Sequence, residues 1–343
     1  MENHHIMIRK GAGGKAFCAG GDVKTVCDEL KSLPSNVVGT GHRGHVHADF
    51  FRTEYEMNYL LGTSKIPQIS FWDGIVMGGG VGVSVLGKFR VATEKTMFAM
   101  PETMIGLFPD VGSSSWLPKI RPAGLGLFIG LTGVRLFASD LLYAGIATHY
   151  VPSARLPALE EALAALRPSD TTHAHELIDE LLREFGRGEV PDQNKAVLQT
   201  RAEIISRIFG KEAAPESDSV STAAIARICS SLQQEADGGC AWSTSTLATL
   251  KKMSPTSLCL THMQLQRGNA LDLKACLEME FRLVLRCMSA PDFREGIRAL
   301  LVDKDNSPRW QPSDLAAVSE RTILGFFAPL AASGNELLLD RLK

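Results

Sequence analysis

Two acidic residues, Glu102 and Asp110, stand eight positions apart in an otherwise apolar stretch of the sequence. A carboxyl group among apolar neighbours loses hydration, which raises its pKa toward the range useful for proton transfer near neutral pH. Two such groups can take different roles, one as a base or nucleophile and the other holding a water molecule. A structural interpretation is equally open, in which Glu102 caps a turn and Asp110 begins another.

Two glycine-rich turns offer a second kind of chemistry. They read CAGGD at 18–22 and MGGGVG at 77–82, and each stands just before an expected helix. The first N–H groups of a helix lack partners within it and carry partial positive charge, and glycine lets a ligand approach the backbone closely. Two such N–H groups on one carbonyl oxygen would form an oxyanion hole. Spacing alone leaves open that the glycines only permit tight turns.

Other nucleotide and nucleophile motifs fail on individual residues. The run 11–16 matches the dinucleotide pattern GxGxxA only weakly, because a second glycine turn rather than a helix follows it. The same run is not a P-loop, since Ala16 stands where serine or threonine is required. The GxSxG elbow around Ser84 fails at Leu86. Ser84 is therefore interpreted as a small packing residue.

Composition excludes several classes of protein. The chain has 343 residues, a formal net charge of −2 and 45% hydrophobic residues, so it is globular and not disordered. Its near-zero charge argues against a nucleic-acid partner. The uncharged run 74–87 is too short for a membrane span, so we expect no membrane partner. Seven scattered cysteines without a CxxC pair, and histidines in a glycine-rich loop at 42–47, predict neither disulfides nor a metal site.

The elements that must position these residues follow from hydrophobic periodicity. In the first half, short apolar runs alternate with helical patterns between glycine turns, which predicts an α/β fold. We expect strands at 5–9, 67–72, 89–92 and 97–99, helices at 23–31, 50–61 and 80–87, and a loop at 34–48.

The second half changes character, because from about residue 156 the pattern is helical. It includes a strongly amphipathic segment at 271–288 and a polar loop at 211–222. We therefore divide the chain into an α/β core, residues 1–155, and a helical C-terminal region, residues 156–343.

Several long strings together resemble a known family. The strings KAFCAGGDV (15–23), the run 74–112 and LTGVRLFASDLLYAGIATHYV (131–151) resemble the enoyl-CoA hydratase/isomerase (crotonase) superfamily. The C-terminal strings MSPTSL (253–258), LEMEFRL (277–283) and the run 292–312 are similar to its 3-hydroxyisobutyryl-CoA hydrolase branch.

The resemblance implies a spiral of β-β-α units that binds an acyl-CoA thioester. It implies that the backbone N–H groups of Gly21 and Gly79 hold the thioester oxygen. Coenzyme A enters as part of the substrate, so no separate cofactor and no metal are expected.

Side-chain roles are implied by position. Glu102 falls on the family's catalytic glutamate and Asp110 on the second acidic residue of the hydrolase branch. Glu54 falls on a further glutamate that contacts substrate. Lys15 and Lys24 fall where related proteins place cations near the CoA phosphates.

Chemistry separates the activities within the superfamily. A hydratase uses a second glutamate after the second glycine turn, and here that position is Gly82, which disfavours hydration. A dienoyl-CoA isomerase is similar at both Glu102 and Asp110 and stays the main alternative enzyme. Glu54 and the C-terminal strings favour hydrolysis of a short branched 3-hydroxyacyl-CoA, in mitochondrial valine catabolism by family analogy. A non-catalytic acyl-CoA-binding protein is the alternative from a different class, and a homo-oligomer is compatible with either.

The beginning of the chain departs from the family pattern. Family members carry a strand, a hairpin and a helix before the first glycine turn, including an RPxxxNAL-like segment, whereas ten residues precede GAGG here. We therefore expect N-terminal elements of the core to be missing from this chain, and any transit peptide with them.

Overall fold

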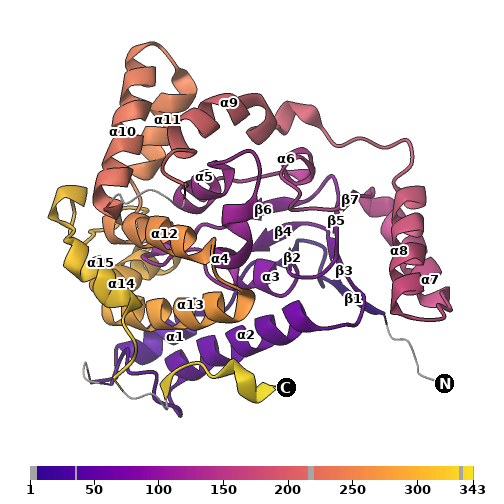
Figure 1. Cartoon of the computed structure of the whole chain (residues 1–343), viewed down its shortest axis with the longest axis horizontal. Helices are drawn as coiled ribbons and strands as arrows, with labels where there is room; N and C mark the ends of the chain where they lie inside the picture. The colour runs from indigo at the N-terminus through magenta and orange to yellow at the C-terminus, as the bar shows by residue number, and fades with distance from the viewer. Residues whose placement is uncertain (1–5, 35–36, 215–219, 332–334, 343) are drawn as a thin grey trace. The chain divides into compact units, whose positions relative to one another are not determined.

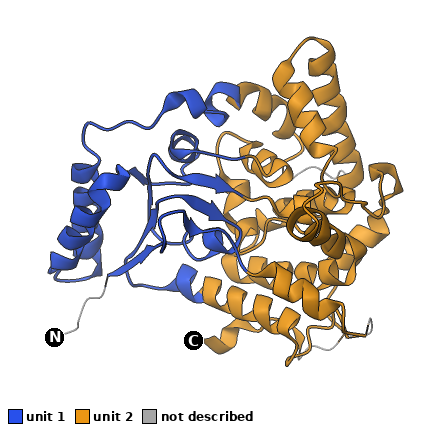
Figure 2. Ribbon diagram, turned by 180° about the vertical axis from the view of Figure 1, so that it is seen from behind, with its two compact units in different colours: residues 1–21, 60–99, 135–201 blue, residues 22–59, 100–134, 202–343 orange. Residues whose placement is uncertain are grey.

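The computed structural model describes residues 6–34, 37–214, 220–331 and 335–342. Its contacts divide the chain into two compact units, each made of three segments (Figure 2). Unit 1 comprises Met1–Gly21, Leu60–Ala99 and Arg135–Arg201, and unit 2 comprises Asp22–Tyr59, Met100–Val134 and Ala202–Lys343.

Unit 1 is built on two sheets, each made of parallel strands (Figure 1). Strand order in the larger sheet is β1 (Met7–Lys10), β3 (Gln68–Trp72), β5 (Phe89–Ala92) and β7 (His149–Tyr150). The smaller sheet has the order β2 (Ala16–Cys18), β4 (Ile75–Met77) and β6 (Met97–Ala99). Along the chain, a strand of the large sheet is followed three times by a strand of the small one.

A helix or helical turn follows each of these strand pairs. They are α1 (Val23–Leu30) after β2, α3 (Gly79–Gly82) after β4 and the 3₁₀ helix η1 (Glu102–Ile105) after β6. Each repeat adds one strand to each sheet, which gives the expected spiral of β-β-α units. The α/β class is confirmed, and this repeat agrees with the spiral that the resemblance implies.

The large sheet is covered by two helices of the same unit. All five residues of β3 are buried, as expected for a central parallel strand with both faces packed. Ile69 and Phe71 of β3 share one apolar cluster with Leu159 of α7 (Leu156–Ala165) and Leu182 of α8 (Thr171–Phe185). This packing holds the large sheet in place. Its strands β1 and β3 are followed in the chain by β2 and β4, the strands that end at the two glycine turns.

Unit 2 is helical among its described residues. Helices α12 (Pro255–Gly268) and α13 (Leu273–Ser289) both contact the short α4 (Ser113–Trp116), and ten residues of α13 are buried. The α-helices of unit 2 are α1, most of α2 (Val46–Thr63), α4 (Ser113–Trp116), α5 (Leu125–Thr132), most of α9 (Leu198–Phe209), α10 (Ser221–Asp237), α11 (Ala241–Leu250), α12 (Pro255–Gly268), α13 (Leu273–Ser289), α14 (Pro291–Ile297) and α15 (Glu320–Phe327).

Two expected helix boundaries are wrong. The second glycine helix ends at Gly82 and not at residue 87, because turns follow it. Helix α2 begins at Val46, inside the expected loop, since the Glu29 carboxylate accepts the N–H groups of Val46 and His47, each over 2.7 Å. This cap comes from another helix, so sequence periodicity could not reveal it.

Two expected strands and one expected helix are confirmed, and a few expected positions lie outside the described residues. The strands at 89–92 and 97–99 have the predicted bounds, and α13 matches the amphipathic segment at 271–288 within two residues. Positions 5, 35–36 and 215–219 of the expected strand and loops lie outside the described residues. Among the described residues, no helix has both the length and the apolar character needed to cross a bilayer. The boundary at residue 155 stays a prediction.

Candidate active site

Four acidic side chains of unit 2 act electrostatically on one another. Glu54 lies on α2, Glu102 on η1, Asp110 in the turn before α4, and Glu280 in the middle of α13. The carboxyl groups of Glu102, Asp110 and Glu280 are buried, at 5%, 6% and 0% exposure, while Glu54 is partly exposed. Proximity of like charges in an apolar setting raises pKa values and makes such a cluster a candidate for acid–base chemistry.

Asp110 is the most acidic member of this cluster. Burial raises its pKa to about 6, while a hydrogen bond from Tyr55 and a backbone hydrogen bond act in the opposite direction. The Tyr55 hydroxyl donates to Asp110 Oδ2 over 2.8 Å, and both groups are buried. Asp110 is therefore the carboxylate that ionises first near neutral pH.

Glu102 and Glu54 favour the protonated form. Burial, and next the charge of Asp110, raise the pKa of Glu102 well above its usual range. Glu102 Oε2 is buried and has no hydrogen-bond partner among the residues that the structure describes. Burial and the charge of Asp110 also raise the pKa of Glu54 to about 8. Near pH 7 the cluster thus combines one ionised carboxylate with neutral acids.

Glu280 lies in the string 277–283, whose residues carry a resemblance but no individually predicted role. Its two carboxyl oxygens accept the backbone N–H groups of Gly112 over 2.7 Å and Ser114 over 2.9 Å. Burial raises the pKa of Glu280 to about 8, and these hydrogen bonds oppose the shift. The available signal was an acidic residue on the apolar face of an amphipathic helix. Tyr55 was also missed, because a buried tyrosine without a known partner has no sequence signature.

The two glycine turns meet within unit 1. Strands β2 and β4 are parallel neighbours, so their carboxyl ends lie side by side. A Cβ on Gly20 would lie 3.6 Å from Met77 O and 4.0 Å from Gly79 N, and a Cβ on Gly80 would lie 2.2 Å from Cys18 O. Glycine at Gly80 is thus required for the close approach of the turns. Gly21 is exposed and Gly79 partly exposed, so a ligand can reach their backbone.

The remaining candidates have simpler surroundings. Lys15, just before β2, and Lys24, in the first turn of α1, are both exposed. Ser84 is buried, accepts a hydrogen bond from Trp72 Nε1 over 2.9 Å and donates to Gly80 O over 2.7 Å. This agrees with its interpretation as a packing residue rather than a nucleophile.

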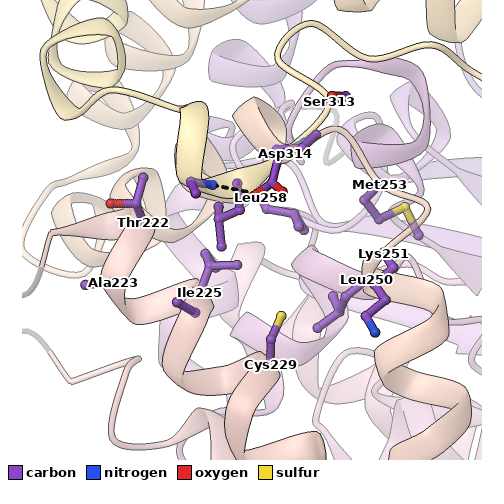
Figure 3. A pocket seen from close by; sticks show the side chains of 14 residues that line it. Thr222, Ala223, Ile225, Cys229, Leu250, Lys251, Met253, Leu258, Ser313 and Asp314 are labelled. Atoms are coloured by element: carbon purple, nitrogen blue, oxygen red, sulfur yellow. Dashed lines mark hydrogen bonds between the residues drawn. The ribbon is translucent and has the colours of Figure 1, made fainter.

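A cavity of about 680 Å³ lies elsewhere in unit 2 (Figure 3). Its lining comes from α10, α11, the start of α12 and residues 313–316, and it is mainly apolar, with Lys251 and Asp314 among the lining residues. Its lining residues do not include Glu54, Glu102, Asp110 or Glu280. The cavity therefore does not carry the acid–base chemistry of the cluster.

A family model described as enoyl-CoA hydratase/isomerase matches residues 1–327. The chain belongs to the enoyl-CoA hydratase/isomerase family. Within this family it is 44% identical over 335 residues to a mitochondrial 3-hydroxyisobutyryl-CoA hydrolase of Gallus gallus, covering 97% of this chain and 79% of that protein. It is 41% identical to the protein of the same name from Homo sapiens, covering 96% of this chain and 78% of that one.

Solved structures place the chain in the same family fold. A carnitinyl-CoA dehydratase from Mycobacterium thermoresistibile has a TM-score of 0.78 at 30% identity, covering 97% of this chain and 85% of its own. An enoyl-CoA hydratase from Rhodobacter sphaeroides has a TM-score of 0.76 at 30% identity, and the match covers 97% of this chain and 86% of that protein. The resemblance predicted from the sequence strings is confirmed at the level of family and fold.

Proposed function

We propose that this enzyme hydrolyses the thioester of 3-hydroxyisobutyryl-CoA, releasing 3-hydroxyisobutyrate and free coenzyme A. The observation that carries the proposal is a pair of buried carboxyl groups in unit 2: Asp110, which accepts a hydrogen bond from Tyr55, and Glu102, whose Oε2 has no partner among the described residues. Relatives more than 40% identical are named 3-hydroxyisobutyryl-CoA hydrolase, which supports this substrate. The reaction needs no cofactor besides the coenzyme A that the substrate carries.

Glu102 and Asp110 share one proton near neutral pH in this proposal. A water molecule or substrate group donating to Glu102 Oε2 favours the ionised form of Glu102, and the proton then resides on Asp110, next to Tyr55. Glu102 attacks the thioester carbon or takes a proton from the attacking water. Asp110 positions the water and supplies the proton to the leaving sulfur.

In the general-base route the water oxygen forms the C–O bond, the C–S bond breaks, CoA leaves as a thiol with the Asp110 proton, and the water proton on Glu102 passes back to Asp110. In the nucleophilic route a Glu102 oxygen forms the C–O bond of a mixed anhydride while CoA leaves as a thiol with the Asp110 proton. A water that gives a proton to the ionised Asp110 then hydrolyses the anhydride, which frees the acid and the Glu102 carboxylate.

The backbone N–H groups of Gly21 and Gly79 stabilise the oxygen of the tetrahedral intermediate in this proposal. By analogy with other oxyanion holes, each donor contributes about 3–4 kcal/mol to the transition state. The meeting of the two glycine turns and the exposure of Gly21 support this assignment.

Glu54 contacts the substrate, and Lys15 and Lys24 pair with CoA phosphates. A pKa of about 8 keeps Glu54 protonated at pH 7, so its carboxyl group can donate a hydrogen bond to the 3-hydroxyl group. The lysines are exposed, so they can pair with phosphate without the large cost of burying a charge. The relatives are named as mitochondrial proteins, and we extend mitochondrial location and valine catabolism to this chain as part of the proposal. A homo-oligomer stays a prediction.

Hydration or dehydration is the second candidate, because the two solved structures described above are named a dehydratase and a hydratase. Gly82 argues against it, since no carboxylate stands where a hydratase of the family places its second glutamate. Isomerisation of a dienoyl-CoA and acyl-CoA binding without turnover are the other outcomes that an assay must separate.

One assay separates these functions. Free CoA is followed with a thiol reagent during incubation with 3-hydroxyisobutyryl-CoA, enoyl-CoA and dienoyl-CoA substrates, while the products are identified by mass spectrometry. We expect CoA release from 3-hydroxyisobutyryl-CoA, reduced at least about 100-fold in Glu102→Ala and in Asp110→Asn. Equal CoA release by wild type and Glu102→Ala would refute the assignment, and tight CoA binding without any product would favour a binding protein.

A further inference from the structure

The turn that carries Asp110 is held from α13 by a buried carboxyl group. Glu280 is fully buried, and its two oxygens take different backbone partners: Oε2 accepts the N–H of Gly112 over 2.7 Å and Oε1 that of Ser114 over 2.9 Å. Both N–H groups belong to residues that closely follow Asp110 in the chain, and both lie in buried surroundings. Glu280 therefore satisfies two buried donors of the turn at once.

The backbone of this turn is strained. Val111 has φ +53° and Gly112 has φ +85°, so two consecutive residues adopt the left-handed region. A β-branched residue such as Val111 rarely adopts this conformation, which persists only where the surroundings enforce it. The Ser113 N–H closes the turn by donating to Asp110 O over 3.0 Å. The direction in which Asp110 points thus depends on a conformation that the local sequence does not favour.

Helix α12 supports the same turn from a second direction. Gln264 Nε2 and Ser113 Oγ both donate to Pro109 O, the carbonyl just before Asp110. A Cβ on Gly268 would lie 2.2 Å from Ser114 O, so α12 packs directly on the backbone of the turn. These contacts fix both ends of the turn, and Glu280 is its titratable support.

We propose that Glu280 is a positioning residue, which holds the turn 110–114 in its strained conformation and so keeps the Asp110 carboxylate against Tyr55. The inference rests on the proposed role of Asp110 in hydrolysis. An apolar side chain of the same length would fill the space in α13 at no cost in charge burial. A glutamate at this position is explained by the two N–H groups that it accepts.

Asp110 faces titratable groups on three elements. A change in its pKa can therefore be assigned only if these groups are considered together. They are Glu54 and Tyr55 on α2, Glu102 on η1, and Glu280 and Cys287 on α13.

The test compares graded variants of Glu280 in the full chain. Glu280→Gln keeps one acceptor oxygen, and Glu280→Met keeps the size and no acceptor of comparable strength. Leu285→Ala is the matched control, because Leu285 is buried on the same helix but contacts the loop at Gly41. Asp110→Asn tests the underlying function. For each variant, kcat, KM, the pH dependence of kcat/KM and the midpoint of thermal unfolding are measured.

We expect kcat to fall about 100-fold in Glu280→Met, as for a misplaced catalytic group, and less in Glu280→Gln, with KM nearly unchanged in both. When Asp110 loses its contact with Tyr55, its pKa rises, so the acid limb of kcat/KM moves to higher pH. Leu285→Ala lowers the unfolding midpoint and leaves kcat and the acid limb in place.

Two results would overturn the inference. If Glu280→Met only lowers the unfolding midpoint, as Leu285→Ala does, Glu280 is a structural residue. If Glu280→Met does not fold, Glu280→Gln decides instead. A kcat equal to that of wild type and an unshifted acid limb in Glu280→Gln would likewise show that Glu280 is a structural residue. Full activity in Asp110→Asn would instead refute the proposed function and leave the support of the turn unaffected.

Discussion

The Tyr55 hydroxyl donates a hydrogen bond to Asp110 Oδ2 over 2.8 Å, between two buried side chains that are 55 residues apart in the sequence. This contact distinguishes Asp110 from Glu102, whose Oε2 has no hydrogen-bond partner among the described residues. A carboxylate that accepts a hydrogen bond ionises more readily than one that does not. The contact therefore favours the negative charge of the pair on Asp110, in addition to the burial that disfavours an ionised Glu102.

Removal of this hydroxyl tests the contact directly. In Tyr55→Phe the hydrogen bond that lowers the pKa of Asp110 is lost, so that pKa rises above its present value of about 6. We expect the acid limb of kcat/KM to move upward and the activity below pH 7 to fall most. Tyr143→Phe, on α6 (Ala138–Tyr143) of unit 1, serves as the control and should leave the profile unchanged. Identical profiles for wild type and Tyr55→Phe would contradict this account.

Substrate binding should depend on the protonation of Glu54. Because its pKa is about 8, Glu54 is neutral at pH 7, and the neutral amide of Glu54→Gln can replace it as a donor. We expect Glu54→Gln to keep a KM close to that of wild type at pH 7, and Glu54→Ala to raise it about tenfold or more through loss of one hydrogen bond. Above pH 8 the KM of wild type should rise as Glu54 ionises, whereas that of Glu54→Gln should not. A parallel rise in both proteins would assign the effect to another group.

Close packing of the glycine turns predicts a sharp contrast between two glycine substitutions. In Gly80→Ala the new Cβ would stand 2.2 Å from Cys18 O, so a backbone segment must shift. We expect a strong loss of kcat and of stability, because the turn that carries Gly79 moves. Gly325→Ala on α15 meets no atom within 4 Å and should stabilise the helix by up to about 1 kcal/mol. Chemical denaturation and CoA-release kinetics check both variants, and a fully active Gly80→Ala would rule out a tight meeting of the turns.

Stability should depend on pH through Glu280. Its pKa of about 8 in the folded chain lies above the ordinary value of 4.5, so the folded state binds this proton more tightly than the unfolded state. Its stabilising contribution is complete below about pH 4.5 and is lost as pH rises through about 8, with a slope of at most about 1.4 kcal/mol per pH unit. Glu280→Gln lacks this proton. Urea unfolding between pH 5 and pH 9 should therefore show the free energy of unfolding falling more steeply in wild type than in Glu280→Gln; equal slopes would contradict the shifted pKa.

Strands in apolar runs flanked by turn residues were predictable, even at three residues, whereas two strands of the same length within the glycine-rich segments were not. Phe89–Ala92 and Met97–Ala99 have their predicted bounds because turn residues flank apolar runs. Ala16–Cys18 and Ile75–Met77 were missed, since each has three residues between glycine-rich segments and is defined by pairing with a distant strand. Periodicity within a window cannot detect such pairing.

The same limit applies to the candidate site. Glu102 and Asp110 stood out because acidic residues are conspicuous among apolar neighbours. Glu280 did not, because its partner Gly112 is 168 positions away. The contact matters because Val111 adopts the left-handed conformation. The sequence could not predict this conformation, because valine favours extended backbone.

The order of the small sheet, β2–β4–β6, has a consequence for how activities diversify on this fold. The residues proposed for chemistry come soon after these strands along the chain: Gly21 after β2, Gly79 after β4 and Glu102 after β6. Each successive repeat of the spiral thus contributes one functional group from the same position, shortly after its small-sheet strand. A substitution at one of these positions can change the reaction and leave the strand pairing intact. New specificity can therefore evolve without a new fold.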